Sequence, residues 1–242
     1  MRPQPLLPLQ VEPSKRYDLI ILAYQVWFLS PSQPMTAFLA SPEAAQLLKD
    51  RPVVTLIGCR NMWLMAQEKV KARLTQLGAR LVDNIALTDA CGTAASFLAT
   101  PLWLFTGRQK PYSWVPRAGI DEAEIAAAGR FGEAIKQRLA ADELPITEPM
   151  LRGLGAVKID EKLIASEKVG NRSFQAWSRL LSALGPQQSR RRTVGLVIYI
   201  VFLLCLIVTV VPVTALLKKL LAPLTKARVQ REKAYYAGPS GE

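Results

Sequence analysis

Two short stretches of the chain carry aromatic, polar and cationic side chains that could contact a flat, partly charged ligand. The first stretch is Gln25, Val26, Trp27 and Phe28. Its two aromatic rings offer flat apolar surfaces, and the amide of Gln25 could meet the polar edge of a bound ring. An aromatic turn that packs on the protein itself, without a ligand, is the alternative interpretation.

The second stretch is Gly58, Cys59, Arg60 and Asn61. Gly58 has no side chain, so a ligand could approach the backbone closely there. Arg60 could balance negative charge on a ligand, and it could equally be an ordinary surface cation. Cys59 could be a redox thiol, although packing as a small apolar side chain is the favoured interpretation.

The absence of histidine restricts the chemistry of this chain more than any other feature. Without histidine the chain cannot build a Ser-His-Asp or Cys-His site by itself, and it lacks the commonest metal ligand. The carboxylates Asp121, Glu122 and Glu124 are better explained as first-turn residues of a helix than as metal ligands. The sequence therefore predicts neither catalytic residues nor a metal site.

Apolar runs precede both stretches and predict the strands that position them. Leu19–Ala23 is continuously apolar and Val53–Ile57 is apolar apart from Thr55, which is typical of parallel strands buried on both faces. Leu81–Leu87 predicts a third strand. Ligands of such sheets bind at the carboxyl ends of the strands. The sequence thus predicts an α/β fold with Gln25–Ser32 and Gly58–Asn61 at the same sheet edge.

Helical patterns separate and follow these strands. One helix is expected from Pro34 to about Leu48, and a second over Met62–Leu77, closed by Gly78. A third is expected over Ile120–Leu139. The connection between the third strand and this helix contains the apolar block Ala94–Phe105, which could cover the ligand site or dip into a membrane surface.

The segment Tyr17–Leu39, with its Tyr-Asp-Leu-Ile-Ile run, its Val-Trp loop and its Pro-Met-Thr-Ala-Phe-Leu run, resembles the third strand and flavin-ring loop of flavodoxin-like proteins. The similarity continues through Pro52–Leu87. Together with Arg60-Asn61-Met62-Trp63-Leu64-Met65-Ala66, it is strongest to the bacterial members called dialkylresorcinol condensing enzymes. The resemblance implies FMN as a cofactor, bound through Gln25–Phe28 and Gly58–Asn61. It also implies a redox or ketosynthase-type partner protein.

The start of the chain departs from that family. A first strand, a phosphate loop rich in Ser, Thr and Gly, a helix and a second strand normally precede the element at Tyr17. Residues 1–16 instead contain four prolines and predict an extended lead-in. We expect a truncated N-terminus or, less favoured, a first half from elsewhere. Leu19–Ala23 would then form an exposed apolar edge, and FMN would bind poorly because its phosphate lacks a cradle.

The C-terminal third is basic and apolar. Residues 150–242 carry a net charge of +10, from 15 Lys and Arg against 5 Asp and Glu, whereas residues 1–149 carry +2. Val194–Leu217 contains 24 residues without a formal charge between two basic clusters, which predicts a transmembrane helix. Asn171–Leu184 has the spacing of an interfacial helix. These patterns favour anionic lipid over nucleic acid as a partner.

The side of the membrane on which each part lies is not fixed by the charges. The positive-inside count slightly favours a cytoplasmic tail, and three widely spaced cysteines favour a reducing compartment. A single span cannot place both the tail and a cytoplasmic main domain on one side. A re-entrant helix bent at Pro212 could, so single-pass and re-entrant attachment both remain open.

The predicted fold is α/β, a partial flavodoxin-like parallel sheet without its first two strands, followed by amphipathic and transmembrane helices. Its expected segments are a lead-in (1–16), the α/β domain (17–141), a linker with an amphipathic helix (142–189), a transmembrane segment (190–219) and a basic tail (220–242).

The leading functional hypothesis is a membrane-anchored, FMN-linked redox or accessory component acting on lipophilic substrates. One alternative is a non-catalytic accessory protein of a lipid or aryl-polyene pathway that does not bind flavin. Another is condensation carried out with a partner that supplies the missing Cys and His.

Overall fold

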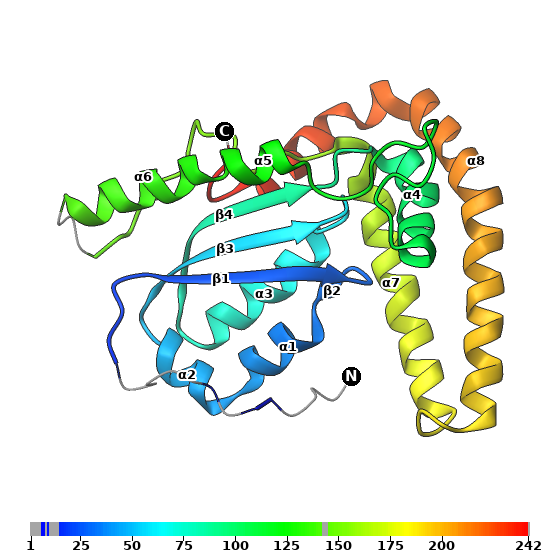
Figure 1. Ribbon diagram of the computed structural model, residues 1–242, viewed down its shortest axis with the longest axis horizontal. Helices are drawn as coiled ribbons and strands as arrows, with labels where there is room; N and C mark the ends of the chain where they lie inside the picture. The colour runs from blue at the N-terminus through cyan, green and yellow to red at the C-terminus, as the bar shows by residue number, and fades with distance from the viewer. Residues whose placement is uncertain (1–5, 8, 10–14, 142–144, 242) are drawn as a thin grey trace. The chain divides into compact units, whose positions relative to one another are not determined.

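The computed structural model describes residues 6–7, 9, 15–141 and 145–241 and shows a mixed α/β protein. Four strands form one sheet in the order β2-β1-β3-β4 (Figure 1). β1, β3 and β4 are parallel, and the two-residue β2 runs antiparallel to β1. The strands are β1 (Ile20–Trp27), β2 (Ser30–Pro31), β3 (Pro52–Cys59) and β4 (Arg80–Thr88).

Eight helices occur in the described residues. They are α1 (Gln33–Ala40), α2 (Pro42–Leu48), α3 (Leu64–Gln76), α4 (Thr93–Thr106), α5 (Glu122–Ala127), α6 (Gly129–Ala140), α7 (Glu161–Ala183) and α8 (Arg190–Ala237). The chain divides into two compact units. A helical unit comprises Glu161–Lys233, and an α/β unit comprises Arg2–Asp160 and Ala234–Glu242.

β3 is the central strand of the parallel sheet, and its two faces are covered by different helices. Val54 packs with Phe131 and Ile135 of α6. The next residue, Thr55, accepts a hydrogen bond from the Gln67 side chain of α3. Because successive residues of a strand point to opposite faces, α3 and α6 cover opposite sides of the sheet. The prediction that Val53–Ile57 forms a strand buried on both faces is confirmed.

The prediction that Leu19–Ala23 is buried on both faces is wrong. β1 is longer than predicted and alternates, with Leu22 and Tyr24 buried but Ile21 53% exposed. Within the described residues one face of β1 is covered, and its outer edge pairs with β2 at Val26 and Trp27. The described residues place no strand on the remainder of that edge. Most of the apolar run therefore lies at an edge of the sheet that the described residues form.

Two predicted long helices are each divided in two. Ser41 ends α1 and caps α2, where its hydroxyl accepts from the Ala44 amide, because a residue before a proline such as Pro42 avoids the helical conformation. Ala128 separates α5 from α6. The carboxylate of Asp121 caps α5, as the first-turn interpretation of the acidic residues predicted.

The apolar block Ala94–Phe105, which was predicted as part of a connection, forms helix α4. It runs through Pro101 and ends at Gly107, whose φ of 70° lies in the left-handed region. Ala99 of α4 is buried against Val115 and Ala118. Gly78, with φ of 72°, ends the segment after α3 as predicted.

In the helical unit, α7 extends further toward the N-terminus than the predicted interfacial helix. α8 is one helix of 48 residues that contains the predicted apolar segment. Among the described residues, Arg190–Thr214 of α8 is the one segment whose length and composition suffice to cross a membrane. The residues predicted as a basic tail continue this helix and then rejoin the α/β unit at Ala234.

Candidate functional site

The first candidate stretch lies at the carboxyl end of β1 and in the turn after it. Gln25 and Trp27 belong to β1 rather than to a loop, and both project from its exposed face. The indole Nε1 of Trp27 donates a 3.2 Å hydrogen bond to Oε1 of Gln25. Trp27 is 46% exposed and Phe28 is 69% exposed. The aromatic pair is therefore presented to solvent instead of packing inside the protein.

The turn between β1 and β2 consists of Phe28 and Leu29, and both have positive φ, 50° and 58°. Two successive left-handed residues suit the right-handed twist of a two-residue hairpin, but Asn and Gly usually occupy these positions. A side chain with a Cβ pays about 1–2 kcal/mol for this conformation. The Lys69 ammonium fixes the turn by donating to the Leu29 carbonyl at 3.2 Å and to the Ser30 hydroxyl at 2.7 Å.

The second candidate stretch lies at the end of the neighbouring strand, and the structure brings the two stretches together there. Gln25 of β1 is paired with Gly58 of β3. A Cβ placed on Gly58 would meet Cδ1 of Ile120 at 3.7 Å, an ordinary van der Waals contact. The packing of the chain itself therefore does not require glycine at this position.

Arg60 contacts α4 and Cys59 contacts β4, on the side of β3 opposite to β1. The Nε of Arg60 donates a 2.7 Å hydrogen bond to the Ser96 hydroxyl of α4. Desolvation of the half-buried guanidinium lowers the pKa of Arg60, and the nearby carboxylate of Asp89 opposes this shift. The Sγ of Cys59 lies 3.8 Å from the Leu87 carbonyl. Asn61 follows on the surface loop before α3, partly buried.

The amide of Asp89 donates to the carbonyls of Cys59 and Arg60 at 3.1 and 2.9 Å. These bonds connect the loop after β3 to the loop after β4. The helices α1, α3 and α4 all begin beyond the carboxyl ends of strands, and none has a side-chain cap. Their partial positive charge, together with Arg60, makes this edge of the sheet favourable for an anionic group.

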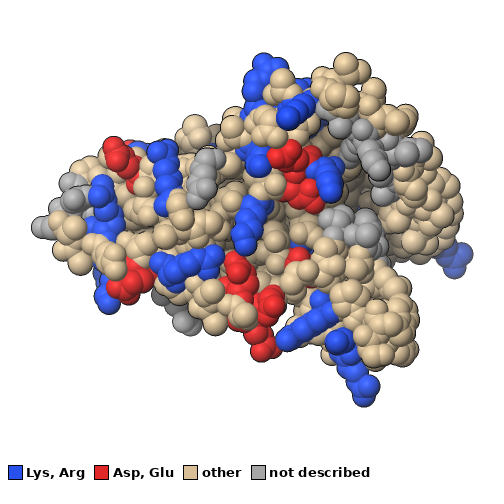
Figure 2. Space-filling model, turned by 90° about the horizontal axis from the view of Figure 1, so that it is seen from above, with Lys and Arg blue, Asp and Glu red and all other residues tan. Residues whose placement is uncertain are grey.

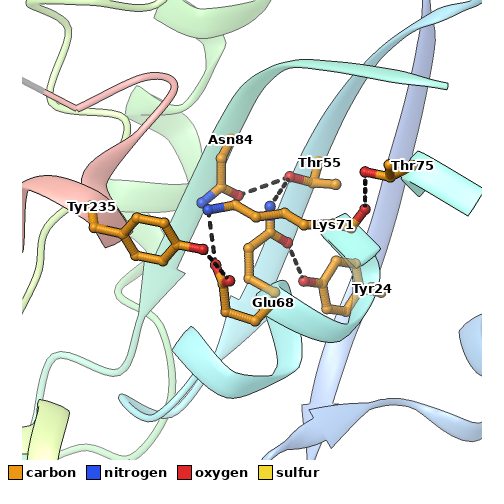
Figure 3. A network of polar contacts seen from close by, with 8 residues as sticks. Tyr24, Thr55, Glu68, Lys71, Thr75, Asn84 and Tyr235 are labelled. Atoms are coloured by element: carbon orange, nitrogen blue, oxygen red, sulfur yellow. Dashed lines mark hydrogen bonds and ion pairs between the residues drawn. The ribbon is translucent and has the colours of Figure 1, made fainter. Parts of the chain in front are cut away.

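A buried polar network that the sequence analysis missed lies behind this edge (Figure 3). The Tyr24 hydroxyl donates to Oε1 of Gln67 at 2.5 Å, and Nε2 of Gln67 donates to the Thr55 hydroxyl at 2.9 Å. Thr55 in turn donates to Oδ1 of Asn84 at 2.9 Å. Burial raises the pKa of Tyr24 above its ordinary value, with a smaller contribution from the nearby Cys59.

This network connects three strands to α3 through neutral groups, so it positions β1 rather than supplying an acid or a base. The Nδ2 of Asn84 is buried, and among the described residues it has no hydrogen-bond partner. A sequence signal was present: Tyr24, Thr55 and Asn84 each place a polar group within a strand pattern. A buried polar group in a strand needs a hydrogen-bond partner. The identity of that partner depends on which strands become neighbours.

Acidic and basic side chains are interspersed among larger uncharged areas on the face shown in Figure 2. The described residues of that face therefore do not form one continuous basic surface. In the part of the chain that the structure describes, no group of three or more His, Cys, Asp or Glu side chains is arranged to hold a metal ion.

Comparison with known proteins identified no relative of this chain. No protein-family model, no curated protein and no solved structure matches the chain.

Proposed function

We propose that this chain is a membrane-attached α/β protein that binds the ring of a flavin at the carboxyl ends of β1 and β3. It would serve as a redox or accessory component for lipophilic substrates. One observation carries the proposal: Trp27 and Phe28 are exposed beside each other at the end of β1, on a turn held in an uncommon conformation. Strained, exposed backbone at a strand end is characteristic of binding sites.

The chain's own residues would hold and orient the ring. Trp27 and Phe28 supply stacking surfaces, Gln25 supplies an amide, and Gly58 leaves the neighbouring strand end without a side chain. The helix N-termini and Arg60 favour negative charge at this edge. FMN, when bound, would supply hydride or electron transfer, for which the protein provides binding and electrostatics.

This chain is less suited to bind the phosphate of FMN than to bind the flavin ring. Residues 1–16 contain no glycine and a single serine, so they offer no Ser/Thr- and Gly-rich phosphate loop. Phosphate groups are normally held by backbone N–H groups at such loops and helix N-termini. We therefore expect binding to depend mainly on ring contacts and to be weaker than micromolar.

The test compares FMN with riboflavin, which has the same ring without the phosphate. The full chain, purified in detergent, is titrated with each ligand, and quenching of flavin fluorescence is measured. The proposal expects saturable binding of both ligands with similar affinities. No binding of either at millimolar concentration would refute flavin recognition, and tight binding of FMN alone would show that a phosphate site exists elsewhere in the chain.

The second candidate function is a non-catalytic accessory protein on an α/β scaffold that does not bind flavin. It is favoured by the internal bonds of the polar groups at the edge: Gln25 accepts from Trp27, and Arg60 donates to Ser96. Such a protein would act beside an enzyme, of ketosynthase type for example, that supplies the catalytic Cys and His. Membrane attachment without flavin binding in the titration above would support this function.

A further inference from the structure

The end of the chain, after the long helix α8, is bound to the α/β unit by buried polar contacts. The Ser240 hydroxyl donates to Oδ1 of Asp83 at 2.7 Å and accepts from the amide of Asn84 at 2.5 Å, and Ser240 is only 2% exposed. The Tyr235 hydroxyl donates to Oε2 of Glu68 at 2.7 Å (Figure 3). The segment Ala234–Gly241 is thus a part of the α/β unit and not a loose tail.

Both ends of the helical unit are consequently connected to the same α/β unit, at Asp160 and at Ala234. Within the helical unit, its first and last residues are also bonded to each other. Lys233 donates to Glu161 at 2.8 Å, and Lys168 forms a 3.0 Å ion pair with Glu232. The helical unit is therefore an insertion whose two ends both join the α/β unit.

This connectivity limits how the helical unit can contact a bilayer. Because the α/β unit is folded on one side, the chain between Asp160 and Ala234 must cross a bilayer an even number of times. Among the described residues, only Arg190–Thr214 is long and apolar enough to cross. α7 cannot provide a second crossing because it contains six charged side chains, namely Glu161, Lys162, Glu167, Lys168, Arg172 and Arg179.

From these contacts we infer that α8 is a monotopic membrane anchor. It enters the lipid leaflet that faces the α/β unit and leaves from the same surface, without crossing the bilayer. This inference rests on the membrane attachment in the proposed function and decides between the single-pass and re-entrant forms of that attachment.

The packing of α7 and α8 within the helical unit agrees with a helix that turns back. Trp177 of α7 packs against Tyr199 and Phe202 of α8, with ring centroids 5.2 and 5.3 Å apart. From Trp177 back to Glu161 is 16 residues, but from Tyr199 on to Gln230, which bonds Glu161, is 31 residues. At about 1.5 Å per residue these lengths are ~24 and ~46 Å.

α8 must therefore bend away from α7 between the two contacts, and Figure 1 shows this bend. Pro212 and Pro223 lie inside this stretch of the helix. Each proline removes one backbone hydrogen bond and kinks a helix. A kinked helix can enter and leave a single membrane surface.

Lipid is the occupant that the side chains of α8 require. Its apolar side chains are exposed in several directions around the helix, including Val194, Ile198, Ile200 and Val210. Cationic residues precede the apolar segment at Arg190, Arg191 and Arg192 and follow it at Lys226, Arg228 and Arg231. Anionic headgroups of one leaflet would attract both sets of cations.

The test labels single cysteines from one side of a sealed membrane. The full chain is expressed with its three cysteines replaced (Cys59→Ala, Cys91→Ser and Cys205→Ala). Gln137→Cys marks the α/β unit, Gln187→Cys marks the connection before α8, and Arg231→Cys marks the region after the apolar segment. Right-side-out and inverted vesicles, washed with carbonate, are treated with a membrane-impermeant maleimide.

A monotopic anchor predicts that all three cysteines react in the same type of vesicle. Reaction of Gln187→Cys only in the opposite type would show a complete crossing and overturn the inference. If the protein leaves the membranes during the carbonate wash, the proposed attachment itself fails, and this outcome is visible before labelling.

A fourth variant tests the premise that the end of the chain stays bound. Ala237→Cys should resist the maleimide in membrane-bound protein until denaturant is added, because Ala237 is buried and its replacement keeps the bonds of Ser240 to Asp83 and Asn84. Rapid reaction of Ala237→Cys without denaturant would show that the end of the chain is released, and the even-crossing argument would then be void.

Discussion

The hydroxyl of Ser240 donates a 2.7 Å hydrogen bond to Oδ1 of Asp83 across 157 positions of the chain. The same carboxylate accepts from the backbone amides of Met150 at 2.7 Å and Leu151 at 3.4 Å. One buried side chain of β4 therefore joins the strand to the segment after α6 and to the end of the chain. The same contacts cover the outer edge of β4, where the Ala86 amide also donates to the Ala156 carbonyl.

Removing this hydroxyl should destabilise the protein. Ser240→Ala loses a hydrogen bond to a carboxylate, a type of bond worth about 1.5–3 kcal/mol, and the free energy of unfolding in urea should fall by that amount. Ser182→Ala is the matched control, because Ser182 is exposed on α7 and donates to the Ser178 carbonyl within its own helix. Its effect should stay within about 0.5 kcal/mol. Equal losses in the two variants would contradict the role of Ser240.

The stability of the α/β unit should depend on the ionisation of Asp83. Desolvation raises the pKa of Asp83, and the hydrogen bonds from Ser240, Met150 and Leu151 oppose this shift. A raised folded-state pKa means that the folded protein retains the proton longer than the unfolded chain. Its stabilising contribution is therefore complete below the ordinary value of about 3.9 and is lost as the pH rises through the folded-state pKa.

Urea unfolding at a series of pH values can check this sign. The stability of the natural chain relative to Asp83→Asn should fall as the pH rises from about 4. Ser240→Ala, which removes one of the opposing hydrogen bonds, should extend that fall to higher pH. A relative stability that instead rises over this range would show that the hydrogen bonds outweigh desolvation.

Replacing Trp27 tests the proposed flavin surface. Trp27→Ala should weaken flavin binding by about 1–3 kcal/mol, the range found for the loss of an aromatic stack, measured by fluorescence titration. Ile21→Ala is the control, since Ile21 lies on the same exposed face near the other end of β1. Identical affinities of the natural chain and Trp27→Ala would remove Trp27 from the site.

The strained turn offers a test in which stability rises. Leu29 has a φ of 58°, and asparagine tolerates this conformation better than leucine. Leu29→Asn should therefore raise the free energy of unfolding by up to about 1 kcal/mol. Leu29→Ala keeps the strain and should bring no such gain. A loss of stability in Leu29→Asn would mean that packing of the leucine side chain matters more than backbone strain.

Charged residues within α8 should release the protein from membranes. Leu204→Lys and Val208→Lys, made together, each add a charge that costs about 2.5–3.5 kcal/mol at the centre of an inserted helix. After a carbonate wash the double variant should move from the pellet to the supernatant. Val169→Lys, at an exposed position of α7, should remain in the pellet with the natural chain. Retention of the double variant would show that this part of α8 does not contact lipid.

Local sequence patterns determined which segments form regular structure. The apolar run Val53–Ile57 predicted a buried strand, and the spacing of Met62–Leu77 predicted the helix that follows it. The uncharged segment Val194–Leu217 predicted a long apolar helix. These features depend on residues close together in the chain, because helix and strand periodicity bring near neighbours onto one face. The Ser41-Pro42 pair, which divides α1 from α2, is also a local signal.

The tertiary structure decided which of these segments become neighbours. The apolar run Leu19–Ala23 looks like that of β3, but β1 lies at the edge of the long strands, so Ile21 remains exposed. The network from Tyr24 to Asn84 and the bond from Ser240 to Asp83 join residues far apart in the chain. Burial and hydrogen bonding depend on the three-dimensional surroundings of a residue, and no local pattern contains them. For this physical reason the sequence predicted an apolar helix, and only the tertiary structure supplied the bound end of the chain from which a monotopic anchor is proposed.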